Sequence, residues 1–130
     1  MALAGWSHIS MTVSDLDRSS AWYADVLGWS EVGRGRSDHT AFAHGPLPGG
    51  GTLVLRQHDQ PGQGPFDETR PGLDHLSLVA ESGTDLAELE QRVISAGLPY
   101  TPSRDFPFGR MLTFRDPDGI ALEAIAPPGS

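Results

Sequence analysis

Two histidines at matched positions and one isolated carboxylate are the residues with the clearest potential for chemistry. His8 opens the run His-Ile-Ser, and His75 opens the similar run His-Leu-Ser at an offset of 67 residues. Glu123 stands in the apolar stretch 120–126, where an unpaired buried carboxylate carries a desolvation cost. Two imidazoles and one carboxylate bind a divalent metal and leave coordination positions open, a set that suits Fe(II) and also accepts Mn, Zn, Ni or Co. The alternatives are ordinary strand histidines and a Glu123 that faces water or pairs with Arg115.

The elements that must position these residues form two similar halves. The first half predicts a strand from His8, a helix from Leu16 to Leu27 that ends at Gly28, and a capping box formed by Ser14 and Asp17. Three short strands follow, near residues 30–33, 40–43 and 52–57. The second half predicts a strand over 73–79, a helix that starts near Asp85 and stops at Gly97, and strands over 111–114 and 120–126.

The similarity of the halves predicts the fold. The offset of 67 at the first strands becomes 69 at the glycines that end the helices, as an insertion near residues 82–83 would cause. Such self-similarity indicates a repeated unit. We expect an α+β fold in which two βαβββ modules form a curved, half-open, barrel-like mixed sheet with the helices outside. The single domain 1–130 would comprise module 1 (about 4–59), a connecting loop (60–72) and module 2 (73–127).

Composition narrows the class of protein. The 130 residues carry 9 basic and 17 acidic side chains, a formal charge of −8, and no Cys. Every basic residue is Arg, which excludes lysine chemistry, and the acidic balance argues against nucleic acid. No apolar run approaches the roughly 20 residues of a membrane span, and the N-terminus lacks the pattern of a signal peptide. We therefore expect no nucleic-acid or membrane partner and a cytoplasmic location.

The motifs around these residues resemble the vicinal oxygen chelate superfamily, which includes glyoxalase I, extradiol dioxygenases and bleomycin-resistance proteins. The resemblance rests on the opening run from His8 to Leu16, the helix pattern over 21–29, and the closing run from Phe114 to Glu123. It implies paired βαβββ modules, a homodimer whose metal sites are in some relatives shared between chains, and metal ligands at His8, His75 and Glu123.

Departures from the family patterns limit the reactions that the resemblance implies. The fourth ligand of glyoxalase I would fall on Leu55, which cannot bind metal, although Gln57 lies two residues on. Thr113 stands where extradiol dioxygenases place a Tyr, and the Lys of fosfomycin transferases has no counterpart.

Further residues are candidates for the substrate pocket. His39, His44 and His58 are candidate general bases, because an unperturbed histidine titrates near pH 6.5. The segment 99–110 is rich in aromatic residues and suits either a lid over a planar substrate or a connection packed on the sheet. Arg56, Arg110 and Arg115 can anchor a carboxylate or phenolate, or else lie solvated at the surface. The predicted pocket residues are Ser10, Ser77, Leu55, Gln57, Tyr100, Phe106, Phe108 and Arg110.

We therefore predict a metal-dependent enzyme that acts on a small molecule. The reaction we favour is oxygenation, by a non-haem Fe(II)-type dioxygenase, of an aromatic or enol/phenol substrate that chelates the metal. The alternatives are a glyoxalase-like lyase or isomerase that uses Zn, Ni or Mn, and a bleomycin-resistance-like binding protein. The charge of −8 would suit such a binding protein, because it attracts cationic antibiotics.

Overall fold

The computed structural model of the chain describes all residues, 1–130, and divides them into two compact units, 1–63 and 64–130. The boundary falls in the predicted connecting loop. Each unit contains a strand, a helix and three further strands in that order. Each is therefore a βαβββ module, which confirms the predicted α+β class, whereas the joint barrel-like sheet and the dimer stay predictions.

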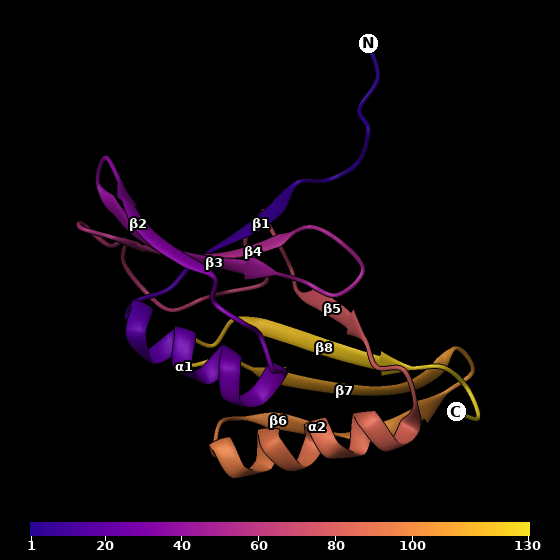
Figure 1. Cartoon of the computed structure of the whole chain (residues 1–130). Coiled ribbons are helices and arrows are strands. Elements are labelled where there is room, and N and C mark those ends of the chain that lie inside the picture. The colour runs from indigo at the N-terminus through magenta and orange to yellow at the C-terminus, as the bar shows by residue number, and fades with distance from the viewer. The chain divides into compact units, whose positions relative to one another are not determined.

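Unit 1 is a mixed four-stranded sheet with one helix (Figure 1). The strand order is β1-β4-β3-β2, in which β1 runs parallel to β4 and the other neighbours are antiparallel. Its elements are β1 (His8–Thr12), α1 (Leu16–Leu27), β2 (Gly33–Ser37), β3 (Thr40–Pro46) and β4 (Thr52–His58).

Helix α1 has the predicted bounds but a different N-cap. Asp15, in an extended conformation, accepts a hydrogen bond from the backbone N–H of Arg18 at 3.0 Å. Ser14 lies one residue before the N-cap position, and its hydroxyl accepts a hydrogen bond from the Arg18 guanidinium instead. The predicted capping box was therefore wrong. Gly28 ends the helix in the left-handed conformation, as predicted, with φ of 68°.

Unit 2 repeats the topology with the strand order β5-β8-β7-β6, in which β5 runs parallel to β8. Its elements are β5 (Leu76–Val79), α2 (Gly83–Ala96), β6 (Tyr100–Phe106), β7 (Gly109–Arg115) and β8 (Ala121–Ala126). Helix α2 starts earlier than predicted, because the Ser82 hydroxyl accepts from the N–H of Asp85. Strand β5 starts three residues later than predicted, so His75 lies just before it.

The segment 99–110 was predicted as a lid or a connection, and it is a strand followed by a tight turn. Strand β6 pairs antiparallel with β7, with Tyr100 opposite Phe114 and Phe106 opposite Gly109. At about 3.3 Å per residue, Tyr100 and Phe106 lie about 20 Å apart along the strand. The aromatic residues of this segment therefore cannot close together over one substrate, and the lid prediction was wrong.

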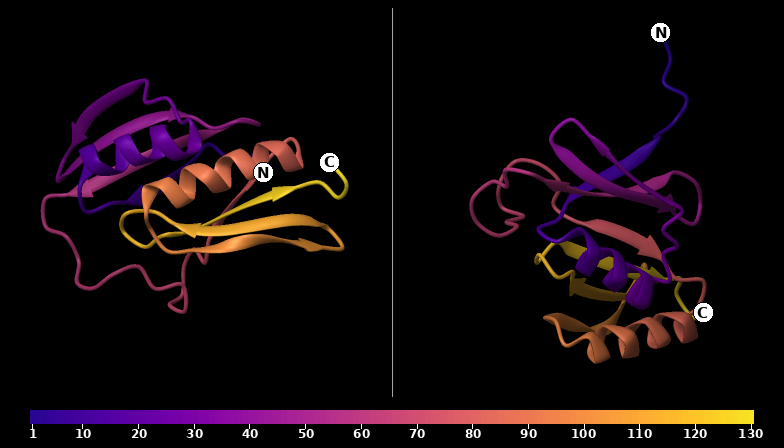
Figure 2. Two further views of the ribbon diagram at one scale, coloured as in Figure 1. Left: turned by 90° about the horizontal axis from the view of Figure 1, so that it is seen from below. Right: turned by 60° about the vertical axis from the view of Figure 1, so that its left-hand side comes forward.

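In each unit the helix lies against one face of its own sheet (Figure 2). In unit 2 the buried face of the sheet carries Leu112, Phe114 and Leu122, and α2 contributes Leu86 and Val93 to the core. Because side chains alternate along a strand, Thr113 and Glu123 lie on the opposite, open face. Neither helix is long and apolar enough to cross a membrane.

The turn between β7 and β8 depends on a buried carboxylate. Asp116 is 1% exposed, and its Oδ1 accepts hydrogen bonds from the N–H groups of Asp118 at 2.9 Å and Ile120 at 2.8 Å. Gly119 completes the turn at φ of 78°. This turn sets the start of β8 and hence the placement of Glu123.

We predict that Asp116→Ala lowers the free energy of unfolding by about 2 kcal/mol or more, because it leaves buried N–H groups without an acceptor. Urea denaturation measures the change. Asp116→Asn keeps an oxygen acceptor and should lose less than the alanine variant. A loss below about 0.5 kcal/mol for Asp116→Ala would show that the turn does not depend on this side chain.

Candidate metal site

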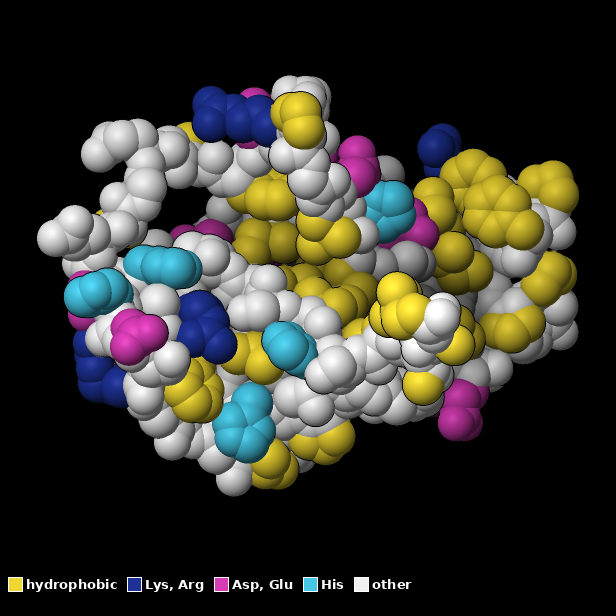
Figure 3. Space-filling view, turned by 90° about the horizontal axis from the view of Figure 1, so that it is seen from above, with side chains coloured by type: hydrophobic (Ala, Val, Ile, Leu, Met, Phe, Trp, Pro, Cys, Tyr) yellow, Lys and Arg dark blue, Asp and Glu magenta, His cyan; other side chains and the backbone are white.

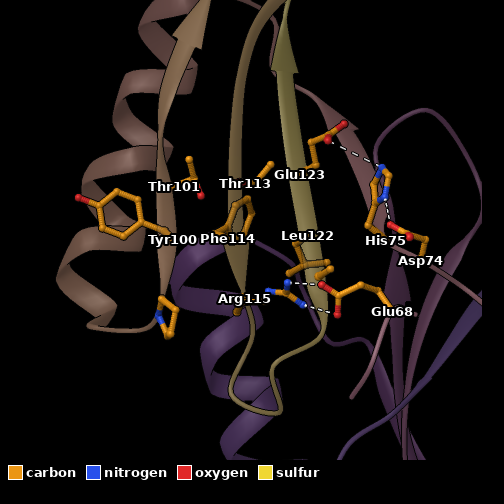
Figure 4. A pocket seen from close by; sticks show the side chains of 12 residues that line it. Glu68, Asp74, His75, Tyr100, Thr101, Thr113, Phe114, Arg115, Leu122 and Glu123 are labelled. Atoms are coloured by element: carbon orange, nitrogen blue, oxygen red, sulfur yellow. Dashed lines mark hydrogen bonds and ion pairs between the residues drawn. The ribbon is translucent and has the colours of Figure 1, made fainter. Parts of the chain in front are cut away.

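His75 and Glu123 converge on the open face of the unit 2 sheet (Figure 4). His75 precedes β5, Glu123 lies on β8, and these two strands are parallel neighbours. The His75 Nε2 atom lies 3.8 Å from Glu123 Oε2. The His75 side chain is 42% exposed and that of Glu123 is 14% exposed, so both can meet a ligand from the open side.

Neighbouring side chains orient both donors. Asp74 Oδ1 lies 2.7 Å from His75 Nδ1, and the Ser77 hydroxyl donates to Glu123 Oε1 at 2.8 Å. These bonds leave His75 Nε2 and Glu123 Oε2 free to share a ligand. The bond to Asp74 is the main cause that raises the pKa of His75 above 6.5; partial burial opposes it, and the charges of Glu123 and Asp74 add to it. The proton on His75 must therefore leave when a metal binds.

The donors fit a divalent cation. Metal–ligand bonds of about 2.0–2.2 Å place adjacent donors about 3–3.5 Å apart, close to the observed separation. A neutral imidazole whose other nitrogen binds a carboxylate is the usual form of a metal-binding histidine. Neither unit by itself brings three His, Asp or Glu side chains together in this way. Unit 2 therefore supplies two of the three predicted ligands, His75 and Glu123.

A pocket of about 330 Å³ adjoins His75 and Glu123. Its wall combines residues of β7 and β8 with the start of β6 and the loop before β5. The lining residues are Glu68, Asp74, His75, Pro99, Tyr100, Thr101, Thr113, Phe114, Arg115, Ala121, Leu122 and Glu123. Of the predicted pocket residues in unit 2, Tyr100 lines this pocket, and Ser77 lies beside it through its bond to Glu123.

The other predicted pocket residues of unit 2 lie elsewhere. Phe106 and Phe108 stack at the far end of the β6–β7 hairpin, with ring centroids 5.1 Å apart. Arg110 donates to Ser103 Oγ at 3.1 Å and to Asp105 Oδ1 at 3.0 Å. Because Ser103 also donates to Glu90 of α2, this network lies on the helix face, opposite Glu123. These three residues do not line the pocket.

An ion pair closes one side of the pocket. Arg115 donates to both carboxylate oxygens of Glu68, at 2.5 and 3.2 Å, and to the carbonyl of Gly119 at 3.1 Å. The pair attaches the loop before β5 to strand β7. Its main effect on Glu68 is to lower the pKa of the carboxyl below 4.5, because the Arg115 guanidinium donates to the ionised form.

We predict that this pair stabilises the fold only when Glu68 is ionised. Because the folded pKa is lowered, the contribution is fully present above about pH 4.5 and is lost as the pH falls through the folded pKa. The difference in unfolding free energy between the wild type and Glu68→Gln should therefore be largest at neutral pH and vanish in acid. Urea denaturation from pH 3 to 7 measures it, and a difference that grows in acid would contradict the prediction.

In unit 1, His8 and Ser10 lie on β1, and both are exposed. The Nδ1 atom of His8 lies 2.9 Å from Ser7 Oγ. The five histidines are all at least partly exposed, and several are visible at the surface in Figure 3 (cyan). The convergence of His8 with His75 and Glu123 stays a prediction.

Strand register corrects the fourth ligand position. Ser10 pairs with Val54 on the neighbouring parallel strand, as Ser77 pairs with Glu123 in unit 2. Val54, not Leu55, is therefore the counterpart of Glu123. Leu55 is fully buried on the α1 side, and Gln57 accepts the N–H of Leu16 at 2.8 Å. The fourth position is still occupied by an aliphatic side chain, and Gln57 is committed to the helix.

The candidate bases lie far from His8 within unit 1. His58 is the last residue of β4. His39 lies beside it, because the carbonyl of His39 accepts a hydrogen bond from the N–H of Asp59, the residue after His58. His8 pairs with Thr52 at the start of the same strand. Six residues of extended chain, about 20 Å, separate the two ends. The structure therefore does not bring His39 or His58 to His8.

Sequence reasoning missed Asp74, and a usable signal existed. An acidic residue directly before a proposed histidine ligand is a candidate to bind its second ring nitrogen. Glu68 was missed because it lies in a loop with no periodic pattern, 47 residues from Arg115.

The comparisons with known proteins agree with this architecture. A family model described as the Glyoxalase/Bleomycin resistance protein/Dioxygenase superfamily matches residues 5–124. The crystal structure of a glyoxylase/bleomycin resistance protein/dioxygenase domain from Frankia sp. EAN1pec is 56% identical, with a TM-score of 0.92 over 99% of this chain and 96% of that one. YwkD of Bacillus subtilis is 30% identical over 95% of this chain and 97% of its own length.

A more distant neighbour shares the fold alone. The fosfomycin resistance protein FosX of Listeria monocytogenes, solved with Mn(II) and sulfate, is 19% identical with a TM-score of 0.73 over 96% of this chain and 93% of that one. The match of the family model over nearly the whole chain shows that the protein belongs to the Glyoxalase/Bleomycin resistance protein/Dioxygenase superfamily.

Proposed function

We propose that the protein is a metal-dependent enzyme whose divalent cation is held by His8, His75 and Glu123. The observation that carries the proposal is the 3.8 Å approach of His75 Nε2 to Glu123 Oε2. Each of these two donors is oriented by a second side chain, Asp74 or Ser77. Family membership supports the assignment of His8 as the third ligand.

The set of ligands favours a substrate that binds the metal directly. A divalent cation supplies Lewis acidity that lowers the pKa of a chelating hydroxyl, and Fe(II) also supplies reactivity toward O₂. Because Val54 is aliphatic, only three protein donors are available and further positions stay open. The pocket beside His75 and Glu123 has room for a small planar molecule.

We favour oxygenation of an aromatic, enol or phenol substrate that offers two neighbouring oxygens. Two histidines, one carboxylate and open positions are the ligand pattern of non-haem Fe(II) oxygenases. Within the chain, Asp74 holds His75 in the tautomer that presents Nε2, and Ser77 fixes one oxygen of Glu123. Thr113 pairs with Glu123 across the sheet, and Thr101 pairs with Thr113, so two hydroxyls face the same open side and can bind substrate oxygens.

A redox-neutral reaction is the second candidate. The FosX structure holds Mn(II) on the same fold. In general, Mn(II) can act as a Lewis acid without a change of oxidation state. Such a lyase or isomerase would use the same three residues. The two candidates differ in the metal that supports turnover and in the consumption of O₂.

Metal analysis combined with O₂ uptake separates the candidates. The protein is purified without chelator, its metal content is measured, and the apoprotein is reloaded with Fe(II), Mn(II), Zn(II) or Ni(II) under anaerobic conditions. Stoichiometric iron, with O₂ uptake on a catechol, supports oxygenation. Turnover with Mn(II), Zn(II) or Ni(II) and no O₂ uptake supports the lyase or isomerase. Failure to bind any divalent metal, with ligand binding unchanged in His8→Ala, contradicts both and supports a binding protein.

A further inference from the structure

The open face of the unit 1 sheet carries a half-buried arginine without an acidic partner. Arg56 on β4 pairs with Phe42 on β3, so both side chains lie on the face opposite α1. Arg56 Nη1 donates to Thr40 Oγ1 at 2.7 Å, and its Nε lies 3.5 Å from Ser10 Oγ. Both neighbours are neutral hydroxyls. By contrast, five other arginines form carboxylate pairs: Arg34, Arg36, Arg70, Arg110 and Arg115.

No acidic residue of the sheet can neutralise Arg56. The cross-strand pairs assign one set of strand residues to its face, and none of them is Asp or Glu. They are His8, Ser10, Thr12, Gly33, Gly35, Ser37, Thr40, Phe42, His44, Pro46, Thr52, Val54, Arg56 and His58. A partly buried guanidinium is costly without a counter-charge. Its planar fork of N–H donors matches the two oxygens of a carboxylate.

Two aromatic rings form a flat wall beside this cation. The Arg56 guanidinium carbon lies 5.2 Å from the centroid of the Phe42 ring, a cation–π contact. The Phe42 and His44 ring centroids are 6.2 Å apart.

Two glycines of β2 make room for these rings. A Cβ atom on Gly35 would lie 3.0 Å from Phe42 Cζ, and one on Gly33 would lie 2.5 Å from His44 Nε2. Each ring thus lies against backbone where any other residue would push it away. Together the rings offer a stacking surface next to a positive charge.

The spacing along β1 relates this wall to the proposed metal ligand His8. His8 and Ser10 share a face of β1 and lie about 7 Å apart along the strand. Ser10 in turn lies beside the Arg56 Nε. One substituted aromatic ring spans the separation between an anion at Arg56 and an oxygen at His8.

We propose that Arg56, Phe42 and His44 form a subsite for the carboxylate-bearing end of a planar aromatic substrate. The inference rests on the proposed function, and it names the substrate class: phenol- or catechol-type rings with a carboxylate remote from the chelating oxygens. Arg56 binds the carboxylate, Phe42 and His44 stack on the ring, and the opposite end of the ring reaches His8.

Binding of benzoate and of its neutral isostere benzamide tests the subsite. Both are titrated into the metal-free full chain in the presence of EDTA, with amide NMR shifts as the readout. We expect the wild type to prefer benzoate at least tenfold, and Arg56→Gln to lose that preference. The matched control Arg36→Gln changes an exposed arginine of the same sheet that pairs with Asp59, and it should keep the preference. Equal binding of the two probes by the wild type would overturn the inference, as would an unchanged preference in Arg56→Gln.

A second variant tests the aromatic wall. Gly35→Ala places a methyl group against the Phe42 ring, and it should weaken benzoate and benzamide to a similar extent. If Arg56→Gln does not fold, the side-chain Nε–H resonance of Arg56 in the wild type decides: a shift on addition of benzoate supports the subsite, and no shift overturns it.

These measurements are independent of the metal. Arg56→Gln should bind Mn(II) as the wild type does, because Arg56 is not among the proposed ligands. A protein that binds benzoate through Arg56 but no metal would therefore refute the proposed function and leave the anion subsite standing. A protein that binds metal but does not distinguish the two probes would refute the subsite alone.

Discussion

Replacement of His75 by Ala is expected to weaken the binding of a divalent metal by more than about 100-fold, because even residues that only orient metal ligands contribute about 10–100-fold. His75 supplies the Nε2 atom that approaches Glu123, so its removal leaves Glu123 without its histidine partner. Calorimetric titration of the apoprotein with Mn(II) at pH 8 measures the loss of metal affinity. Turnover that depends on the metal should be lost to the same extent.

His39→Ala is the matched control, because His39 is exposed and lies outside the proposed ligand set. Its affinity for Mn(II) should equal that of the wild type. Glu123→Gln retains the size of the side chain and an oxygen for the Ser77 bond, and it should weaken binding as His75→Ala does. Full affinity in either His75→Ala or Glu123→Gln would place the metal elsewhere.

The second large effect is expected from Asp74→Asn, with a loss of about tenfold or more in metal affinity. Asp74 bonds to His75 Nδ1 and so holds the ring with Nε2 toward Glu123. The measurement belongs at high pH, where protons compete least with the metal for His75. There the change reports mainly on the orientation of the ring.

The same variant has an independent readout. The bond to Asp74 is the first cause of the raised pKa of His75, so Asp74→Asn should lower that pKa toward 6.5 in the apoprotein. Histidine NMR shifts as a function of pH measure it. Asp67→Asn removes a charge from the same unit without touching His75, and it should leave both values unchanged. A lowered pKa with wild-type metal affinity would limit Asp74 to an electrostatic role.

The modules were predictable from the sequence because their signals are local. Apolar spacing predicted α1 from Leu16 to Leu27, and Gly28 and Gly97 do end their helices in the left-handed conformation. The match between His8-Ile-Ser and His75-Leu-Ser predicted equivalent strands, and β1 and β5 occupy equivalent edges of their sheets. Strand β6 escaped prediction because Pro102 and the charged residues around it hide the alternation, and the strand contains an irregular register between Thr101 and Arg104.

The site was predictable in part, and its errors have a physical cause. Because side chains alternate between the two faces of a strand, an error of one residue in the alignment moves a position to the opposite face. For this reason the comparison of the two halves assigned Leu55, and not Val54, to the fourth ligand position. The offset of 69 at the helix-ending glycines, carried on to the last strand, would have selected Val54. Contacts such as Glu68 with Arg115, and Arg56 with Ser10, join residues 47 and 46 positions apart. No local pattern indicates such pairs.

A crystal structure of the Mn(II)-loaded protein, with data collected at the manganese absorption edge, tests the metal assignment most directly. We predict one strong anomalous peak per chain, within about 2.4 Å of His8 Nε2, His75 Nε2 and a Glu123 carboxylate oxygen, whether His8 comes from the same chain or from a second copy. A peak bound by other residues, or full Mn(II) occupancy with His75 and Glu123 unligated, would contradict it.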